Sequence, residues 1–577
     1  MADAESGARA VQEMRGPFVV KVVSPDILHK SDAGGVALNL ADGDAVAAAI
    51  REMEQKPKIA VARVEGWLVE EMSPAGREVV IGGLDDPEFG PMIMVGLGGI
   101  FVELLRDVSF RICPIDRGDA RAMLDELKSS ALLRGARGEA PVNEEALLDA
   151  MLALGGENGL LMRFAGEIAE ADLNPVIVSP EGAVAVDARF ILAAEPAAAG
   201  DVGDAAMPPR EAFRPLFEPK TVAVLGASAK DVQIANTFIR RMKAFGFAGA
   251  IYPIHPQASE IEGLPAYPSL GDTPEPVDYA YVAIGAARIS DALAAGRGRC
   301  RIAQVISSGF GEITEGRALE RELVEKARAA GTRVIGPNCL GTYSPRGGLT
   351  FPSDAPRELG RIGVVSQSGG LSTDIIKRGQ WRGLRFSGLV TIGNSADVKP
   401  HELVEYYFDD PETRAVGLYI EDVREGRAFF DLLRRHPAPK PVVVLKGGRT
   451  ALGRMAAASH TGAMLSENVA FTLVSRQYGV YLVDDISELL SVAAILAAMP
   501  PARGRRMGVV TSSGGAGSLA ADQGEKYDIA LPELDTSTQA ALSPMIPAFG
   551  ALANPVDVTA QMRSIFHEIF AGVAIAA

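Results

Sequence analysis

The sequence predicts an α/β protein with several domains. Three stretches share one pattern, in which a short β-branched strand leads into a glycine-rich turn and a helix. They are "TVAVLGAS" (221–228), "RIGVVSQSGG" (361–370) and "RMGVVTSSGGAG" (506–517). Strands that alternate with helices form parallel sheets, and turns of this kind lie at the carboxyl ends of the strands. Because 577 residues exceed what one core can hold, we expect a Rossmann-like or flavodoxin-like domain at each of the three stretches.

Changes in composition divide the chain into segments. Residues 196–212 are rich in Ala, Pro, Gly and Asp without periodicity, which is typical of a linker. Weaker breaks occur near 344–360 and 497–506. The first segment mixes apolar strands ("FVVKVV", "GWLVEEM", "PMIMVGL", "VAVDARF") with helices that we expect over 118–133 and 143–154. The expected domains are 1–195, 213–345, 357–500 and 505–577.

The bulk composition excludes several classes of protein. The net charge is −16 and there is no basic run, so a nucleic-acid surface is not expected. The three cysteines are far apart and form no CxxC motif, which argues against disulfides or zinc and fits a reducing compartment. We find neither an apolar run of ~18 residues nor a signal-peptide core. The sequence therefore indicates a cytoplasmic enzyme or binding protein that is not a membrane protein.

The turn "SQSGG" has the composition of an anion site. Ser366 and Ser368 supply hydroxyl groups, and Gly369 and Gly370 leave the backbone bare where the next helix begins. A helix N-terminus attracts phosphate through its free N–H groups and its dipole. The alternative is an ordinary helix cap, because serine is a favoured capping residue.

Two further loops follow predicted strands. Gly226, Ala227 and Ser228 lack a full GxGxxG pattern, so NAD is disfavoured, but their backbone N–H groups suit a phosphate. In "GPNCLG", Asn338 offers an amide to a ligand, and Cys339 has no neighbouring base in the sequence and suits a packed core position. Both loops are also compatible with plain strand–helix connections.

The first segment contains a candidate nucleotide site. We expect Lys21 to end a strand and to point toward the glycine loop at Gly34–Gly35, where it could hold a triphosphate. His29 lies between them and fits a surface loop on composition alone. Asn174 and Asp187 lie on the two sides of a predicted hairpin, and their oxygens would suit Mg²⁺. A capped hairpin with polar edges is the alternative.

One histidine lies in an unusual setting. His460 occurs in "AASHTGAM", among small residues that would leave its ring accessible from more than one direction. A core histidine with small neighbours is the alternative. A neutral imidazole is nucleophilic near pH 7, so a covalent role is chemically possible.

Taken together, these motifs resemble the nucleoside-diphosphate-forming acyl-CoA synthetases, the superfamily of succinyl-CoA ligase and ADP-forming acetate–CoA ligase. Residues 1–195 resemble the ATP-grasp part through "KVVSPDILHKSDAGGV", "EEMSPAGREVVIGG" and "DLNPVIV". Residues 213–577 resemble the α-subunit-like part through "VAVLGAS", "GPNCLG", "GVVSQSGGLS", "YIEDVREG", "SHTGAM" and "NPVDVT". The resemblance implies an ATP-grasp domain, a Rossmann-like CoA-binding domain and two flavodoxin-like ligase domains.

The resemblance also implies a mechanism. Acyl-CoA and phosphate give acyl phosphate and CoA, the phosphoryl group moves to His460, and ADP then receives it. Glu421 matches the carboxylate that orients this histidine. The resemblance implies Mg²⁺, ATP or ADP, and coenzyme A as ligands, with a carboxylic acid as substrate, and a homo-oligomer, namely a dimer.

The remaining matches can be stated residue by residue. ATP is matched by Lys21, Gly34, Gly35, Glu70, Glu71 and Met72, and Mg²⁺ by Asn174 and Asp187; phosphate is matched by Ser366, Ser368, Gly369 and Gly370, and CoA by Gly226, Ala227, Ser228, Asn338 and Cys339. His29 matches a second phosphorylation relay.

Three departures from the family pattern give rise to an alternative. The ATP-grasp part is short before Lys21, the last domain stops early, and the usual "NPK" is "HPQ" at His255–Gln257, which removes a lysine that could meet CoA. The alternative is a non-catalytic CoA- or nucleotide-binding protein of the same family. An acyltransferase would need an additional domain. The sequence does not name the acid.

Overall fold

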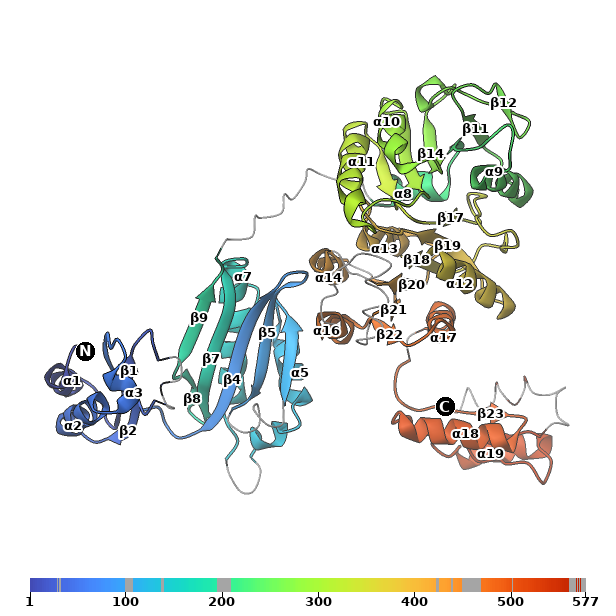
Figure 1. Cartoon of the computed structure of the whole chain (residues 1–577). Coiled ribbons are helices and arrows are strands. Elements are labelled where there is room, and N and C mark those ends of the chain that lie inside the picture. Colours follow the sequence, from blue (N-terminus) through green and yellow to red (C-terminus); the bar gives the residue numbers. More distant parts are fainter. Residues whose placement is uncertain are drawn as a thin grey trace. The chain divides into compact units, whose positions relative to one another are not determined.

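The computed structural model describes most of the chain, shown in Figure 1. The described residues are 1–27, 30, 33–98, 107–135, 140–194, 209–421, 425–436, 439–448, 469–500, 502–559, 567, 569 and 571. They form two compact units, Met1–Ala497 and Ala498–Ala577. No described helix is both long and apolar enough to cross a membrane.

The chain begins with a small antiparallel sheet in the order β2-β1-β3. Five of the six residues of β1 are buried, because its apolar side chains pack against α1 and α2. Asp42 caps α2 by accepting a hydrogen bond from the N–H of Ala45. The elements are α1 (Ala4–Ala10), β1 (Phe18–Val23), β2 (Val36–Leu40), α2 (Gly43–Glu54), α3 (Pro57–Ala60) and β3 (Gly66–Glu71).

A larger antiparallel sheet follows, in the order β6-β5-β4-β7-β8, with β9 also paired to β7. Alternating apolar residues of β4 and β5, such as Val79 and Ile93, form a core with α5 and α6. The elements are β4 (Arg77–Asp86), β5 (Gly90–Leu97), β6 (Val108–Ile112), α5 (Arg117–Glu126), α6 (Glu144–Gly155), α7 (Leu160–Arg163), β7 (Ile168–Ser179), β8 (Gly182–Ala185) and β9 (Ala188–Leu192).

The next sheet is parallel throughout, with the order β11-β10-β14-β15-β16. Its strands are apolar on both faces, as expected where helices cover both sides. Val222 and Val224 pack toward α9, whereas Ala223 and Leu225 pack toward α10 and α11. The elements are α8 (Pro209–Phe217), β10 (Thr221–Leu225), α9 (Ile234–Phe245), β11 (Ala250–Ile254), β12 (Glu260–Ile261), β13 (Leu264–Pro265), β14 (Val277–Val282), α10 (Ile289–Ala294), β15 (Cys300–Val305), α11 (Arg317–Ala329) and β16 (Arg333–Ile335).

A second parallel sheet has the order β17-β19-β18-β20-β21-β22, in which only β17 is antiparallel. The register pairs Ser366 with Thr391 and with Tyr419, so the carboxyl ends of β18, β19 and β20 meet at one edge. The elements are β17 (Thr342–Tyr343), β18 (Ile362–Ser366), α12 (Gly369–Trp381), β19 (Phe386–Thr391), α13 (Pro400–Asp409), β20 (Ala415–Ile420), α14 (Gly426–Arg435), β21 (Val442–Lys446), α16 (Val469–Tyr478), β22 (Tyr481–Val483) and α17 (Ile486–Ala498).

The second compact unit is small. Its two strands pair in parallel, and α18 follows the first of them across the predicted glycine turn. The elements are β23 (Val510–Thr511), α18 (Gly514–Lys526), α19 (Thr536–Leu542) and β24 (Val556–Asp557).

The three predicted strand–turn–helix units are confirmed, but three local predictions are wrong. The helix expected over 118–133 ends at Glu126, because the N–H groups of Lys128 and Ser129 bond to the buried Asp107 carboxylate instead. The linker expected over 196–212 overlaps α8, which already begins at Pro209, while residues 195–208 lie outside the described residues.

The strand expected over "VAVDARF" is also wrong, since it divides into β8 and β9. The division falls at Val186 and Asp187, whose carbonyl groups accept hydrogen bonds from the Lys21 ammonium and from the Asn174 N–H. These long-range partners are invisible in a local pattern.

Candidate active site and its ligand-binding loops

The carboxyl edge of the second parallel sheet brings together two of the predicted motifs. The N–H of Gln367 donates to the carbonyl of Tyr419 at 3.0 Å, and the Gln367 side-chain oxygen accepts from the N–H of Glu421. The Glu421 carboxylate in turn accepts a hydrogen bond from the Tyr419 hydroxyl at 2.8 Å. The "SQSGG" turn and Glu421 are therefore held side by side.

The "SQSGG" turn begins a helix, as predicted. Ser368 is the N-cap of α12, and its hydroxyl accepts from the N–H of Leu371 at 3.3 Å. Ser366 is fully buried and donates to the carbonyl of Ser368, so its hydroxyl is used within the turn. A Cβ atom at Gly370 would meet nothing within 4 Å, which shows open space at the helix start. The capping role of Ser368 and an anion site at the helix start are compatible.

A lysine that the sequence analysis missed completes this edge. The Lys446 ammonium donates to the carbonyl of Glu421 at 2.5 Å and to that of Gly447 at 3.2 Å. The N–H of Gly447 donates to the carbonyl of Ile420 at 2.8 Å. Lys446 ends β21 and could have been found by applying the strand-end rule to every strand of the sheet.

The predicted nucleophile itself is not described. His460 lies in 449–468, which is outside the described residues. His29 is also outside the described residues. What the structure does show is the point from which the segment 449–468 departs. The last described residues before it are Gly447 and Gly448, and a Cβ added at Gly447 would come within 3.1 Å of the Glu421 Cγ. The described residues that precede the segment of His460 thus lie beside Glu421.

In the first segment, the predicted triphosphate lysine is buried and paired. Lys21 lies within β1 rather than at its end, so that part of the prediction is wrong. Its ammonium contacts the Glu70 carboxylate at 2.6 Å and donates to the carbonyl of Val186. An extended strand directs alternate side chains to opposite faces, and Lys21 is thereby directed toward the larger sheet, where the Val186 carbonyl lies.

The two candidate Mg²⁺ ligands are neighbours. The N–H of Asn174 donates to the carbonyl of Asp187 at 3.2 Å. The Asp187 carboxylate also contacts the ammonium of Lys30 at 3.1 Å, a partner that the sequence analysis did not single out. Among the described residues, no group of three or more His, Cys, Asp or Glu side chains could hold a metal. One carboxylate and one amide oxygen fit Mg²⁺, which keeps several waters and binds substrate phosphates.

The other predicted ATP residues occupy two places. Gly34 has φ +68°, and its carbonyl accepts from the Lys56 ammonium at 2.9 Å. A Cβ at Gly35 would come within 2.4 Å of the Val22 side chain, so this position requires glycine.

Glu71 ends β3 and accepts from the N–H of Arg15, and Met72 donates its N–H to the carbonyl of Pro17. Both loops adjoin β1, the strand of Lys21.

The first predicted CoA loop is tightly built. Gly226 has φ +100°, and an added Cβ would lie 2.2 Å from the carbonyl oxygen of Ala283. Ala227 is buried. The N–H of Ser228 was predicted to be open to a ligand, but it donates a hydrogen bond to the Asn236 side chain at 2.9 Å. The following helix begins only at Ile234, so the loop is not itself a helix N-terminus.

The second predicted CoA loop exposes one of its two residues. Asn338 is exposed, with φ 58°. Cys339 is buried, and burial raises the pKa of its thiol to about 12. The Cys339 side chain therefore belongs to the core, as its residue type suggested, and does not present a face to CoA. Asn338 instead bonds to Asn394, which donates to Glu312 at 2.6 Å and Glu320 at 2.8 Å.

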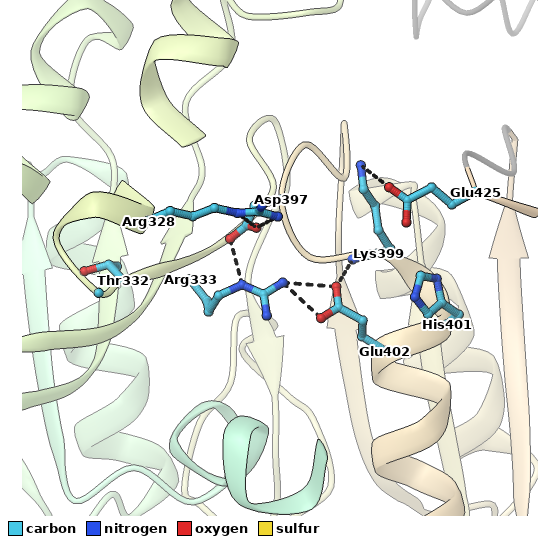
Figure 2. A pocket seen from close by; sticks show the side chains of 9 residues that line it. Arg328, Thr332, Arg333, Asp397, Lys399, His401, Glu402 and Glu425 are labelled. Carbon is cyan, nitrogen blue, oxygen red and sulfur yellow. Dashed lines mark hydrogen bonds and ion pairs between the residues drawn. The ribbon is translucent and has the colours of Figure 1, made fainter. Parts of the chain in front are cut away.

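An ion-pair network joins the two parallel sheets next to this loop (Figure 2). Asp397 is completely buried and accepts from Arg328 at 2.7 Å, Arg333 at 3.0 Å and the N–H of Val334 at 2.7 Å. Arg333 also pairs with Glu402 at the start of α13. The network lines a polar pocket of about 670 Å³. Since its cations are matched by carboxylates, we interpret it as a clamp between the sheets.

Comparison with known proteins assigns the domains. Residues 1–192 match the family model "ATP-grasp domain", residues 220–345 match "CoA binding domain" and residues 359–496 match "Succinyl-CoA ligase like flavodoxin domain". These models and the sheets described above define a multidomain acid–thiol ligase, and they confirm the predicted fold class.

Curated relatives specify the family. Acetate–CoA ligase (ADP-forming) II of Archaeoglobus fulgidus is 34% identical over 562 residues, which cover 96% of this chain and 80% of that protein. Acetate–CoA ligase (ADP-forming) I subunit beta of Pyrococcus furiosus is 45% identical over 190 residues, covering 33% of this chain and 80% of that subunit. The chain belongs to the ADP-forming acetate–CoA ligase family of acyl-CoA synthetases.

A solved structure is similar over part of the chain. It is the dinucleotide-forming acetyl-coenzyme A synthetase 1 of Ca. Korarchaeum cryptofilum in complex with phosphate and ADP. Its sequence identity is 32% and its TM-score is 0.56, with 60% of this chain and 76% of that chain covered.

Proposed function

We propose that the protein is an ADP-forming acyl-CoA ligase that converts an acid, CoA and ATP into acyl-CoA, ADP and phosphate, and back, through phosphorylated His460. Family membership supports the overall reaction. The observation that carries the mechanism is the meeting of Glu421 with the start of α12 at the edge where the His460 segment departs.

In the direction of ATP synthesis, the first step takes place at this edge. A phosphate oxygen attacks the thioester carbonyl, the carbon–sulfur bond breaks, and CoA leaves as thiolate while acyl phosphate forms. The start of α12 stabilises the phosphate charge through its N–H groups and dipole. Ser368, Gly369 and Gly370 are the residues that we assign to this task.

The second step transfers the phosphoryl group. A ring nitrogen of neutral His460 attacks phosphorus, and the carboxylate of the acid departs. Glu421 accepts a hydrogen bond from the other ring nitrogen, which bears the proton, and this fixes the tautomer and stabilises the charge that develops. Lys446 binds the Glu421 carbonyl and holds this turn in place.

The third step returns the phosphoryl group to ADP in the ATP-grasp part. When the nucleotide binds, the Lys21 ammonium gives up its ion pair with Glu70 and forms one with a nucleotide phosphate. A compact ammonium binds phosphate well as a point charge. Asn174 and Asp187 would hold Mg²⁺, which neutralises phosphate charge when it is bound. Lys30 pairs with the Asp187 carboxylate at 3.1 Å, and its ammonium is a further candidate for a contact with the nucleotide phosphates. His29 remains a proposed second relay, and Asn338 and the Gly226–Ser228 loop a proposed CoA site.

The test of this function is a stoichiometric assay of purified protein. With Mg-ATP, CoA and a panel of acids, ADP and phosphate should form in equal amounts with acyl-CoA, and neither AMP nor pyrophosphate should appear. Calorimetric binding of CoA without any turnover on the panel would favour the alternative, a non-catalytic CoA- or nucleotide-binding protein.

A further inference from the structure

The predicted CoA loop "GPNCLG" is attached to a strand of the neighbouring sheet. The loop, 336–341, directly follows β16 of the CoA binding domain. The hydroxyl of Thr391, which ends β19 in the other parallel sheet, accepts hydrogen bonds from the N–H groups of Leu340 at 3.0 Å and Gly341 at 2.8 Å. The same hydroxyl donates to the carbonyl of Gly341 at 2.8 Å. A threonine hydroxyl has one donor and two acceptor positions, so all three are used on this loop.

Thr391 lies next to the proposed phosphate site. The strand register pairs Thr391 with Ser366, the residue that begins the "SQSGG" turn. The N–H of Ile392, the next residue, donates to the carbonyl of Ser366 at 2.9 Å. Leu340 lies against the first residue of α12, since a Cβ added at Gly369 would come within 2.5 Å of the Leu340 Cγ. Thr391 therefore joins the CoA loop to the start of α12.

The turn after β19 holds the first half of the same loop. The N–H of Asn394 donates to the carbonyl of Pro337 at 2.9 Å. The N–H of Ala396 donates to the carbonyl of Gly336, also at 2.9 Å. Gly393 has φ +47°, and a Cβ added there would lie 2.1 Å from the Pro337 carbonyl oxygen. Both halves of the loop are thus bound by residues that end or follow β19.

A buried amide fixes the backbone of Thr391. Gln304 lies in β15 and is completely buried, and its amide nitrogen donates to the carbonyl of Thr391 at 3.0 Å. Its amide oxygen accepts from the hydroxyl groups of Tyr279 at 2.6 Å and Thr342 at 2.8 Å. Thr391 is itself completely buried. Buried hydrogen bonds of this kind are costly to break, so the fold determines where the Thr391 hydroxyl lies.

We propose that Thr391 is a positioning residue for the CoA-dependent step, and that it acts by holding the loop of Asn338 at the start of α12. Asn338 is the exposed residue of this loop, so the side chain that we assign to CoA is kept beside the residues that we assign to phosphate. Because its hydroxyl is occupied by the loop, Thr391 acts through the loop and not by contact with a substrate. This inference rests on the proposed ligase function and adds a residue to its first step.

The first test separates two half-reactions. Thr391→Val removes the hydroxyl and keeps the branched shape. We expect kcat for acyl-CoA formation to fall at least tenfold, because two buried N–H groups lose their acceptor. Labelling by Mg-[γ-³²P]ATP needs neither CoA nor acid and should keep its wild-type rate. Thr391→Ser keeps the hydroxyl and should restore most of the activity.

The outcomes of this test distinguish the inference from the ligase function. An equal loss of both half-reactions in Thr391→Val would assign Thr391 to stability alone, and an unchanged kcat would remove its role altogether; either result overturns the proposal. Absence of label in the wild-type protein would instead contradict the ligase function. Thr391→Ala makes the same test with a smaller side chain if the valine variant does not fold.

The second test does not depend on turnover. Cys339 is buried in the middle of the loop, so its rate of reaction with a thiol reagent reports how firmly the loop is held. In Thr391→Val we expect this rate, followed by mass spectrometry of the Cys339 peptide, to rise at least tenfold. An unchanged rate would show that the loop does not need the hydroxyl and would overturn the proposal.

A matched control is available in the same domain. The buried Thr221 hydroxyl likewise donates to a carbonyl, that of Pro276 at 2.8 Å, and accepts from the N–H of Asp278 at 2.9 Å. Thr221 begins β10, whereas the CoA loop follows the end of β16, so the two lie at opposite edges of one parallel sheet. Thr221→Val should leave both kcat and the rate at Cys339 unchanged. Equal effects of the two valine variants would contradict a specific role of Thr391.

Discussion

The side-chain oxygen of Gln367 accepts a hydrogen bond from the backbone N–H of Glu421. This contact ties the turn after β18 to the turn after β20, and so it fixes the helix start that we propose to bind phosphate relative to the carboxylate that is expected to orient His460. Two residues 54 positions apart are thereby joined at one edge of the sheet.

Replacing Gln367 should impair catalysis more than nucleotide binding. Gln367→Ala leaves the N–H of Glu421 without its partner, which allows the turn to shift. We expect kcat to fall about fivefold with an unchanged KM for ATP, because a lost hydrogen bond of about 1 kcal/mol acts on the transition state rather than on the ATP-grasp part. Steady-state kinetics measures both constants. An equal rise in the KM for ATP would contradict this role of Gln367.

Replacing Asp397 should destabilise the clamp between the two parallel sheets. Asp397→Asn removes the buried anion that Arg328 and Arg333 share, and because both arginine side chains are partly exposed the cost is about 1–2 kcal/mol. Thermal unfolding should show a clear fall in the transition temperature of the parallel-sheet domains. Glu170→Gln removes a pair with Arg189 in which both side chains are half exposed, and it should leave the transition unchanged. Equal effects of the two variants would argue against the clamp.

Alanine substitutions at two glycines should distinguish the effect of a steric clash from the effect of backbone strain. Both Gly226 and Gly246 have positive φ, +100° and +94°, but only at Gly226 would a Cβ meet another atom, the Ala283 oxygen. Gly246→Ala should therefore cost about 1–2 kcal/mol of stability and leave CoA binding intact. Gly226→Ala should lower the stability and also abolish CoA binding, because the new Cβ would displace the loop from the Ala283 carbonyl oxygen. Calorimetry with CoA makes the comparison, and intact binding by Gly226→Ala would remove this loop from the CoA site.

The cysteines should be unreactive in the folded protein. Cys113, Cys300 and Cys339 are all buried, and burial raises the pKa of each thiol to about 12. The thiolate is the reactive form, and at pH 8 its fraction is on the order of 10⁻⁴ for such a pKa. Titration with a thiol reagent should detect almost no thiol in native protein and all of them in denaturant. Rapid native labelling of Cys339 would reopen a role for it at the CoA loop.

The sequence predicted the architecture well because its signals are local. Short β-branched strands, glycine turns and the helix after "SQSGG" depend on neighbouring residues, and the structure confirms them. The family assignment was also confirmed. The predictions were wrong where contacts with residues distant in the sequence determine the local structure. Helix α5 ends earlier than predicted because the next N–H groups donate hydrogen bonds to the Asp107 carboxylate. Lys21 lies within its strand, and its ammonium donates to the carbonyl of Val186.

The same distinction applies to the site. Ser368 and Glu421 were predicted from motifs, and the structure places them at one edge. Lys446 was missed although its place at the end of β21 is a local signal, whereas nothing in the neighbourhoods of Lys30 and Asn394 marks those residues. Their roles appear only when strands of different sequence position are brought into register.

The central claim is that His460 carries the phosphoryl group between the two halves of the reaction. Purified protein incubated with Mg-[γ-³²P]ATP should acquire label that is acid-labile and base-stable, located by mass spectrometry on His460, and released by acid substrate plus CoA. His460→Asn should lack that label while it still binds CoA. Undiminished label in His460→Asn would contradict the phosphohistidine mechanism at this residue and transfer the role to another, with His29→Asn as the next variant.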